Sequence, residues 1–394
     1  MQQKPLDGIR VLDLTQIFQG PYATFLMALA GAEIVKVEPR AGERMRQGVG
    51  AKTTLAFAML NSNKKSLTLD LKHPRGKALL KSMAEKADVL VENFAAGTMD
   101  RLGLGYDVMR EINPRLIYAS GTGYGLSGPD KDLLAMDHTI QAASGVMSIT
   151  GEAGGPPARA GGTPCDIMGG IHLHAGVLQA LLARTLTGKG TRVETAMIET
   201  MYFTLTSDLG AYHRTGKLPE RRGDKTPANT APYGRYRCKD GWIAVICVSE
   251  AQWERVLEVV GRAELIGNPD YEGREKRHAR EAEINAMIED WCRDLPRDEA
   301  FETLRKNRVP VAPIRTLDDV RADPHMHERG MLNWVNHPDM GEIVLPSSPI
   351  RLSEFPPEDL EVFPTIGADS QEVLRDWLDL SDTEIAGLRK EEII

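Results

Sequence analysis

A strand–helix–strand pattern in the first 40 residues constrains the fold more than any other feature. IRVLDLT at 9–15 is a short apolar run typical of a buried strand. YATFLMALAGA at 22–32 has helical spacing and follows Gly20-Pro21, where proline suits a first helical turn. EIVKVEP at 33–39 has the strand pattern again. This unit predicts parallel strands joined by a right-handed crossover.

The same alternation continues to about residue 213. We expect further strands at 87–93, 114–120 and 191–197, and helices at 75–86, 137–147, 169–186 and 198–213. The predicted fold class is therefore α/β, an open parallel sheet with helices on both faces, similar to a Rossmann fold.

The chain changes character after residue 212. The stretch 213–234 is polar and rich in Gly and Pro, as expected of a linker, and 235–249 predicts a hairpin around Lys239-Asp240-Gly241. Helical patterns follow, and Pro310 and Pro313 keep 309–316 extended. The tail, 370–393, predicts two short helices broken near Leu380, the second with a Ser381–Glu384 capping box. The predicted organisation is a large domain at 1–212 completed by 325–394, a linker at 213–234, and a small α+β domain at 235–324.

Composition excludes several classes of protein. The net charge of −8 argues against a general nucleic-acid binder. None of the four cysteines forms a C-x-x-C pair, so we expect no metal site and no dithiol site. The N-terminal residues lack a secretory signal, and no apolar run approaches the roughly 18 residues of a membrane span. We expect a cytoplasmic protein that does not enter a membrane.

A dinucleotide site is not indicated. G-x-G-x-x-G is absent after the first strand, and so is the P-loop motif. GTGYGLSG, from residue 121, carries Leu126 in place of the third glycine. A chain reversal at the end of a strand explains these glycines better than NAD or FAD binding.

Several long motifs resemble one family. They are VLDLTQIFQGPYATFLMALAGAEIVKVEP, NKKSLTLDLKHPRGKALL, ADVLVENFAAGTMDRLGLGYDVMREINPRLIYASGTGYGLSGP and TPCDIMGGIHLHAG. In this order they resemble the class III CoA-transferases of the CaiB/BaiF type, which include formyl-CoA, crotonobetainyl-CoA and succinyl-CoA transferases and the α-methylacyl-CoA racemases. The resemblance covers nearly the whole chain and implies an intertwined homodimer.

The resemblance implies that Asp166 is the nucleophile. Its carboxylate would attack an acyl-CoA thioester and form first an aspartyl anhydride and then an aspartyl-CoA thioester, which splits a difficult exchange into easier steps. Amides such as those of Gly169 and Gly170 could stabilise the oxyanions. The alternative is that Asp166 only caps a helix.

A second acidic position, Asp137, is implied beside the nucleophile, where it would be catalytic or, alternatively, another helix cap. The racemases carry a histidine base directly before this aspartate. Met136 stands there instead, and His138 lies on the other side. Exchange of an α-proton on both faces needs two bases, and methionine cannot be one of them. A 2-methylacyl-CoA racemase is therefore only the second hypothesis. A non-catalytic CoA-binding partner subunit is the third.

Coenzyme A is expected as a substrate, with no separate cofactor. Phosphate and adenine need cations and stacking surfaces. By resemblance the candidates are Gln19, Gly20, Arg40, Leu71, Lys72, Asn93, Phe94, Arg101 and Met197, each with an ordinary surface or core role as its alternative. A lysine that some transferases carry corresponds here to Leu134, with Lys131 three residues earlier.

The acid substrate is less defined. Arg159 could meet a substrate carboxylate, which would suit a dicarboxylic acyl group. The four-glycine run that covers the nucleophile of formyl-CoA transferases does not occur between 225 and 250, so the segment that covers the site must differ.

Overall fold

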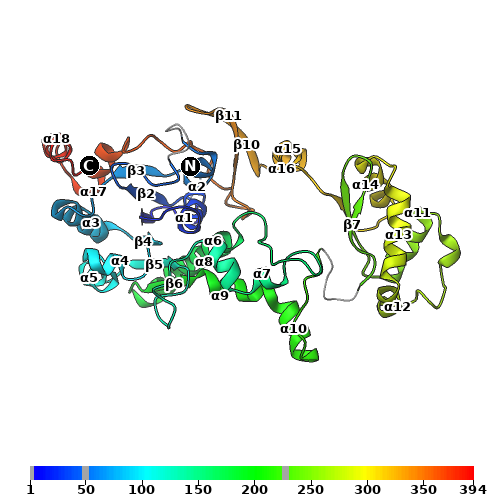
Figure 1. Ribbon diagram of the computed structural model, residues 1–394. Helices are drawn as coiled ribbons and strands as arrows, with labels where there is room; N and C mark the ends of the chain where they lie inside the picture. The colour runs from blue at the N-terminus through cyan, green and yellow to red at the C-terminus, as the bar shows by residue number, and fades with distance from the viewer. Residues whose placement is uncertain (1–3, 47–52, 224–229) are drawn as a thin grey trace. The chain divides into compact units, whose positions relative to one another are not determined.

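The computed structural model describes residues 4–46, 53–223 and 230–394, which form two compact units (Figure 1). The first unit comprises 1–144, 160–203 and 323–394, and the second comprises 145–159 and 204–322. This grouping puts 145–159 and 204–212 outside the predicted large domain. A hydrogen bond helps to explain why 145–159 groups with the second unit, since Gly223 N donates to Gly151 O at 2.8 Å. Residues 224–229 of the predicted linker lie outside the described residues.

A parallel sheet forms the centre of the first unit. Its strands are β1 (Arg10–Asp13), β2 (Glu33–Glu38), β3 (Lys65–Thr68), β4 (Val89–Glu92), β5 (Ile117–Thr122) and β6 (Arg192–Ala196). They lie in the order β3-β2-β1-β4-β5-β6, and every pairing is parallel. This is the doubly wound order, in which the direction of strand addition reverses between β1 and β4. Proteins with this fold usually bind ligands at that point. The α/β prediction is confirmed.

Helices cover both faces of this sheet. The helices of the first unit are α1 (Gln19–Leu29), α2 (Leu55–Asn61), α3 (Pro74–Lys86), α4 (Thr98–Leu102), α5 (Tyr106–Ile112), α6 (Asp137–Ala143), α8 (Pro164–Thr187), α9 (Met197–Tyr202), α16 (Pro324–Glu328), α17 (Ser370–Leu378) and α18 (Asp382–Lys390). The first unit also carries the antiparallel hairpin of β10 (Leu332–His337) and β11 (Gly341–Pro346).

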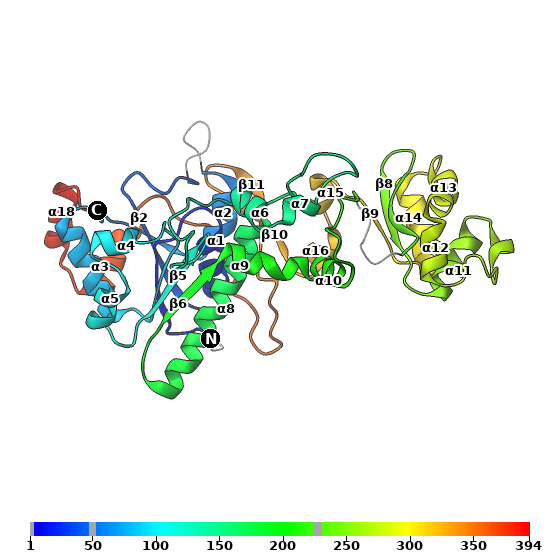
Figure 2. The same cartoon turned by 60° about the horizontal axis from the view of Figure 1, so that its bottom comes forward.

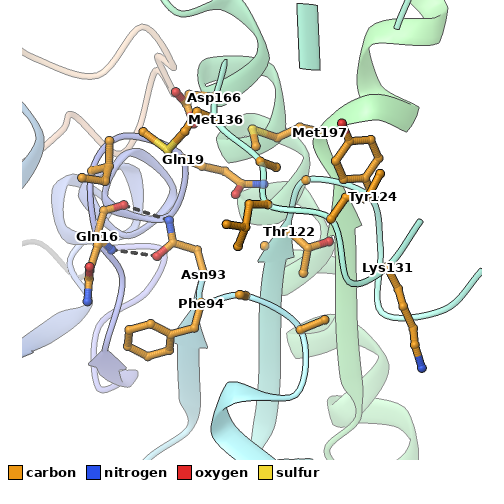
Figure 3. A pocket seen from close by; sticks show the side chains of 18 of the residues that line it. Gln16, Gln19, Asn93, Phe94, Thr122, Tyr124, Lys131, Met136, Asp166 and Met197 are labelled. Carbon is orange, nitrogen blue, oxygen red and sulfur yellow. Dashed lines mark hydrogen bonds between the residues drawn. The ribbon is translucent and has the colours of Figure 1, made fainter. Parts of the chain in front are cut away.

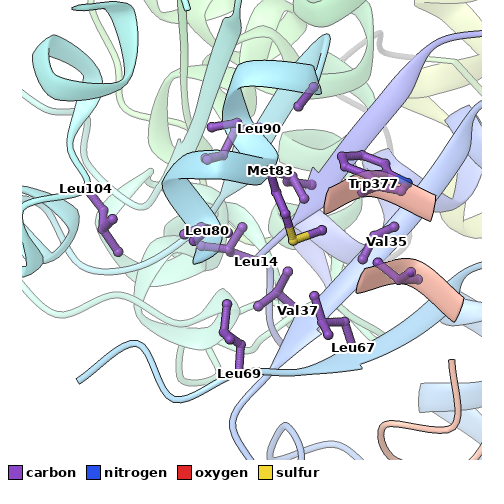
Figure 4. Close-up of a cluster of buried hydrophobic side chains, with 14 of the residues drawn as sticks. Leu14, Val35, Val37, Leu67, Leu69, Leu80, Met83, Leu90, Leu104 and Trp377 are labelled. Carbon is purple, nitrogen blue, oxygen red and sulfur yellow. The ribbon is translucent and has the colours of Figure 1, made fainter. Parts of the chain in front are cut away.

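Two apolar cores follow from the alternation of side chains along the strands. In β1, Leu12 belongs to the core under α3 and α17, whereas its neighbour Val11 belongs to the core under α1 and α8. Figure 4 shows the first core, in which Trp377 of α17 packs near Met83 of α3. The predicted tail helices are confirmed, including the capping box of Ser381 and Glu384. Figure 2 shows these helices beside α3 from a second side.

The long helix α8 is apolar enough, over its 24 residues, to pass a length and composition test for a membrane span. We did not expect a span here from the sequence because the charged residues Asp166 and Arg184 interrupt the apolar run. A core helix passes the same test, and α8 packs against α1 and the sheet through buried Leu173 and Val177.

The second unit is a smaller α+β arrangement. Its antiparallel sheet has the order β7 (Tyr233–Arg237), β8 (Trp242–Ile246), β9 (Val311–Pro313), which confirms the predicted hairpin and adds a third strand from the extended segment. Its helices are α7 (Val146–Ile149), α10 (Thr206–Thr215), α11 (Glu250–Val259), α12 (Arg274–Ala279), α13 (Glu281–Cys292), α14 (Arg297–Lys306) and α15 (Leu317–Arg321).

Candidate active site

The candidate site lies where the sheet order reverses. The loops that follow β1 and β4 leave neighbouring strands at this point, and they are tied to each other. Gln16 N donates to Asn93 Oδ1 at 2.7 Å, and Asn93 Nδ2 donates to Gln16 O at 2.8 Å (Figure 3). A crevice at the carboxyl ends of parallel strands is the usual ligand site of this fold.

A cavity of about 440 Å³ opens there. Its lining comes from the β1 loop and α1, the β4 loop, the end of β5, the segment before α6, and the starts of α8 and α9. These residues are Gln16, Ile17, Gln19, Arg44, Asn93, Phe94, Ala95, Ala96, Gly121, Thr122, Gly123, Tyr124, Lys131, Leu133, Leu134, Ala135, Met136, Asp166 and Met197. All belong to the first unit.

Asp166 stands in the first turn of α8, which begins at Pro164, two residues earlier than Asp166 itself. Thr163 is the N-cap residue, so Asp166 is not the cap of this helix. Asp166 is buried, with an exposed fraction of only 8%. Within the described part of the chain, no group donates a hydrogen bond to its carboxylate. Burial, and then the charge of Asp137, raise the pKa of Asp166 to about 7.

Asp137 is hydrogen-bonded to the first turn of α8. Its Oδ1 accepts Cys165 N–H at 2.8 Å, and its Oδ2 accepts Gln141 Nε2–H at 2.6 Å. The side chain is buried and is not among the residues that line the cavity. Asp137 therefore caps the neighbouring helix α8 rather than its own helix. It acts on Asp166 through charge and position.

Two glycines allow α1 and α8 to approach closely. A Cβ at Gly169 would lie 2.7 Å from Gln19 Nε2, and a Cβ at Gly170 would lie 2.5 Å from Gln19 O. The close atom at Gly170 is backbone and leaves no room for a side chain, whereas a side chain at Gly169 would force the Gln19 amide to shift. Both glycines lie inside α8, where their N–H groups bond to the helix's own carbonyls. The expectation that these amides stabilise an oxyanion is therefore not supported, and the two glycines instead let α1 and α8 pack closely where Gln19 and Asp166 line the same cavity.

The turn before α1 has an unusual backbone. Ile17 has a φ of 65°, which is rare for a β-branched residue. Glu43 Oε1 accepts Ile17 N–H at 3.4 Å, and the buried Lys36 Nζ lies 3.3 Å from Glu43 Oε2 and donates to Thr15 O at 2.8 Å. This buried ion pair fixes the turn that leads into Gln19. Strained backbone of this kind clusters at functional sites.

A second cavity of about 540 Å³ adjoins the first, since Gln16 and Phe94 line both. It brings together four of the predicted CoA-binding residues: Arg40, Leu71, Lys72 and Phe94. Arg40 Nη1 lies 3.1 Å from Glu392 Oε2 at the surface. A ligand with a phosphorylated end and a reactive end could extend from this cavity to Asp166.

The other predicted residues lie in different places. Gln19, Asn93 and Met197 line the Asp166 cavity. Gly20 lines neither, and a Cβ there would lie 2.3 Å from Thr15 Cγ2, so it serves packing. Arg101 also lines neither and donates to Thr98 Oγ1 at 2.9 Å.

Three further observations concern the substrate side. Met136 lines the cavity at the position of the racemase base, while His138 is exposed and is not part of the lining. Arg44 and Lys131 add positive charge to the lining, and the sequence offered no signal for Arg44. Arg159 belongs to the second unit, so its role at a substrate carboxylate stays a prediction.

The doubly wound sheet, with a buried carboxylate in the crevice where its strand order reverses, defines an α/β fold of the kind that binds ligands at this point. The chain belongs to CoA-transferase family III, whose family model matches residues 6–370. It is therefore a family III CoA-transferase.

Named relatives match over almost their whole length. The succinyl-CoA–L-malate CoA-transferase beta subunit of Chloroflexus aurantiacus is 34% identical over 398 residues, covering 99% of this chain and 98% of the relative. The formyl-CoA:oxalate CoA-transferase of Streptomyces avermitilis is 36% identical over 410 residues, covering 99% and 100%. A solved structure of a CaiB/BaiF family protein from Brucella suis superposes with a TM-score of 0.85 at 31% identity, covering 95% of this chain and 100% of that one.

Proposed function

We propose that this enzyme moves CoA from an acyl-CoA thioester to a free carboxylic acid through covalent intermediates on Asp166. One observation carries the proposal. Asp166 is a buried carboxylate in the cavity wall, and among the described residues none donates a hydrogen bond to it or forms an ion pair with it. A carboxylate with that environment is a better nucleophile than a solvated one, and its raised pKa still leaves much of it ionised near pH 7.

The steps balance without a net proton transfer. An Asp166 oxygen bonds to the thioester carbonyl carbon, the C–S bond breaks, and CoA leaves as a thiolate. The thiolate then attacks the Asp166 carbonyl carbon of the anhydride and releases the donor acid, which leaves an aspartyl-CoA thioester. The acceptor carboxylate repeats these steps in reverse and departs as its CoA thioester.

We infer that the acid substrate is a dicarboxylate. Two relatives are named for L-malate and for oxalate, each of which has two carboxyl groups. Arg44 and Lys131 in the cavity wall are the candidates to meet the second carboxylate. The adjoining cavity with Arg40 and Lys72 suits the phosphates of CoA. No metal and no further cofactor enters the proposal.

The intertwined homodimer and the cytoplasmic location stay predictions. Large apolar side chains stand on the exposed side of α8: Ile171, Leu178, Leu182 and Leu186. We propose that a second copy of the chain covers this stripe, since exposed apolar patches commonly mark interfaces.

The test is to incubate the purified chain with a panel of acyl-CoA donors and with monocarboxylic and dicarboxylic acceptors. Borohydride or hydroxylamine trapping followed by peptide mass spectrometry should find the modification at Asp166. A chain that exchanges CoA with no modified residue would refute the covalent route. Exchange of the α-hydrogen in deuterated water would support the racemase hypothesis, and inactivity of the chain alone would support the partner-subunit hypothesis.

A further inference from the structure

One cation in the wall of the Asp166 cavity has no acidic partner. Arg44 is exposed and lines this cavity, and no acidic side chain of the described residues forms an ion pair with it. Asp166 in the same wall is an acid, and its carboxylate repels the carboxylate of an acid substrate. An unpaired cation there offsets that repulsion. Whether a substrate can use the cation depends on how firmly the protein holds it.

The residues on both sides of Arg44 are anchored in the interior. Glu43 is 2% exposed, and its Oε1 accepts the N–H of Met45 at 2.9 Å. Arg46 is 6% exposed and donates to both carboxylate oxygens of Glu38, from Nε at 3.0 Å and from Nη2 at 2.7 Å. These bonds fix the backbone at Arg44. Pairing with a bound carboxylate therefore costs less conformational entropy than it would on a free loop.

The other cation of the wall, Lys131, is less suited to this role. It stands between Asp130 and Asp132 in the sequence, and their charges offset its own. Figure 3 shows its side chain extending away from Asp166. An ammonium is a point charge on a flexible stem, whereas a guanidinium presents a planar fork that matches both oxygens of a carboxylate. These differences favour Arg44 as the residue that recognises a carboxylate.

We propose that Arg44 determines specificity for dicarboxylic substrates, by pairing with the carboxylate that does not react while the other end of the molecule reaches Asp166. The proposal rests on the function proposed above, CoA transfer through Asp166 to a dicarboxylate. Arg44 takes no part in the bonds that form and break, since it meets only the distal end of the acid. Its effect therefore depends on the substrate and vanishes for an acid with a single carboxyl group.

The experiment compares Arg44→Gln with the unsubstituted enzyme on two acceptors of equal chain length that differ by one carboxyl group, such as succinate and butyrate. With one acyl-CoA donor held constant, we expect kcat/KM for the dicarboxylate to fall by about 10- to 100-fold, as is typical when a charge-assisted hydrogen bond is lost. kcat/KM for the monocarboxylate and equilibrium binding of CoA should change little, because Arg40 and Lys72 line the adjoining cavity and Arg44 does not. Arg44→Lys keeps the charge and should lose less of the preference than Arg44→Gln.

The matched control is Arg110→Gln in α5. Arg110 is another exposed arginine of the first unit, and its Nη2 lies 3.9 Å from Asp107 Oδ1. It lines neither cavity, so this variant removes the same charge elsewhere and should leave the rates with both acceptors unchanged. Lys131→Gln removes the other cation of the wall and should lower the rate with the dicarboxylate by less than Arg44→Gln does. If Lys131→Gln abolishes the preference while Arg44→Gln keeps it, the proposal is wrong.

The outcomes separate this role of Arg44 from the function on which it rests. An unsubstituted enzyme that transfers CoA equally well to both acceptors would refute the dicarboxylate substrate, and absence of any adduct would refute Asp166 as the nucleophile. A normal preference for the dicarboxylate in Arg44→Gln would overturn the role of Arg44 alone. Equal losses with both acceptors, or weaker binding of CoA, would also overturn it, because Arg44 would then support the cavity wall or hold a phosphate.

Discussion

Two buried aspartates in the first unit, Asp13 and Asp166, have opposite surroundings. Asp13, at the end of β1, accepts hydrogen bonds from Thr15, from Thr24 Oγ1 at 2.7 Å, and from Lys64 Nζ at 3.0 Å. Burial alone would raise the pKa of Asp13, but Lys64, Lys36 and the two hydroxyl groups lower it to about 2. Asp166 has no such partners, and its pKa rises to about 7.

The difference shows that burial does not decide what an acid does. Asp13 is permanently charged and neutralised, so it holds β1, α1 and Lys64 together. Asp166 pays the cost of desolvation without compensation, and that energy is available to a reaction that removes its charge. We therefore expect the same residue type to be structural in one place and reactive in the other, and the following experiments test that contrast.

The largest expected effect is on turnover. Asp166→Ala should lower kcat by roughly 10⁴-fold or more, because the covalent route is lost. CoA binding should persist, since Arg40 and Lys72 lie in the adjoining cavity. Turnover and equilibrium binding of CoA, measured side by side, check this expectation. Full activity of Asp166→Ala would remove the basis of the comparison.

Next in size is the loss of stability expected from Asp13→Asn. The substitution leaves Lys64 buried without its countercharge, which should destabilise the fold by about 3–5 kcal/mol. Denaturant unfolding at pH 7 measures the change. A neutral result would mean that the Asp13–Lys64 pair does not stabilise the unit.

The same substitution at the other acid, Asp166→Asn, should change the stability of the fold in the opposite direction. The folded-state pKa of Asp166 is raised above the unfolded value of 3.8, so the folded protein binds the extra proton between pH 3.8 and 7 and its stability falls as pH rises through that window. At pH 8 the substitution should therefore stabilise the fold, by on the order of 2–4 kcal/mol. Equal stability of the two proteins at pH 8 would contradict the raised pKa.

The pH dependence of the rate tests the ionised form of Asp166 directly. Only the carboxylate attacks the thioester, so kcat/KM should rise about tenfold per pH unit below pH 7 and level off above it. Initial rates between pH 5 and 9 with a stable acyl-CoA donor provide the profile. A rate that falls through this range would indicate that an acid, and not this base, limits the reaction.

The smallest effect is expected from Asp137→Asn. It removes the like charge that helps to raise the pKa of Asp166 and weakens the bonds to Cys165 and Gln141. The inflection of the rate profile should move down by about one pH unit or less. If the profile keeps its position while the melting temperature falls, Asp137 supports only the start of α8.

Much of the fold could be predicted from the sequence because its signals are local. Strand and helix periodicity gave the α/β class, and the Ser381–Glu384 box gave the start of the last helix. The motif around Asp166 pointed to the candidate nucleophile. The start of α8 was set too late, at 169 and not at Pro164, because glycines near Asp166 resemble a loop when their packing partner is unknown.

The sequence by itself determined the family, the α/β class and the choice of Asp166 as the candidate nucleophile, since these depend on residue type and on spacing along the chain. Only the tertiary structure decided which groups meet: Asp137 at the start of α8, Arg44 in the cavity wall, and the unpartnered Gln19 amide between two glycines. The physical reason is that the reactivity of an acid depends on the charges and donors within a few ångströms of it. Residues far apart in sequence supply these, and only packing brings them together.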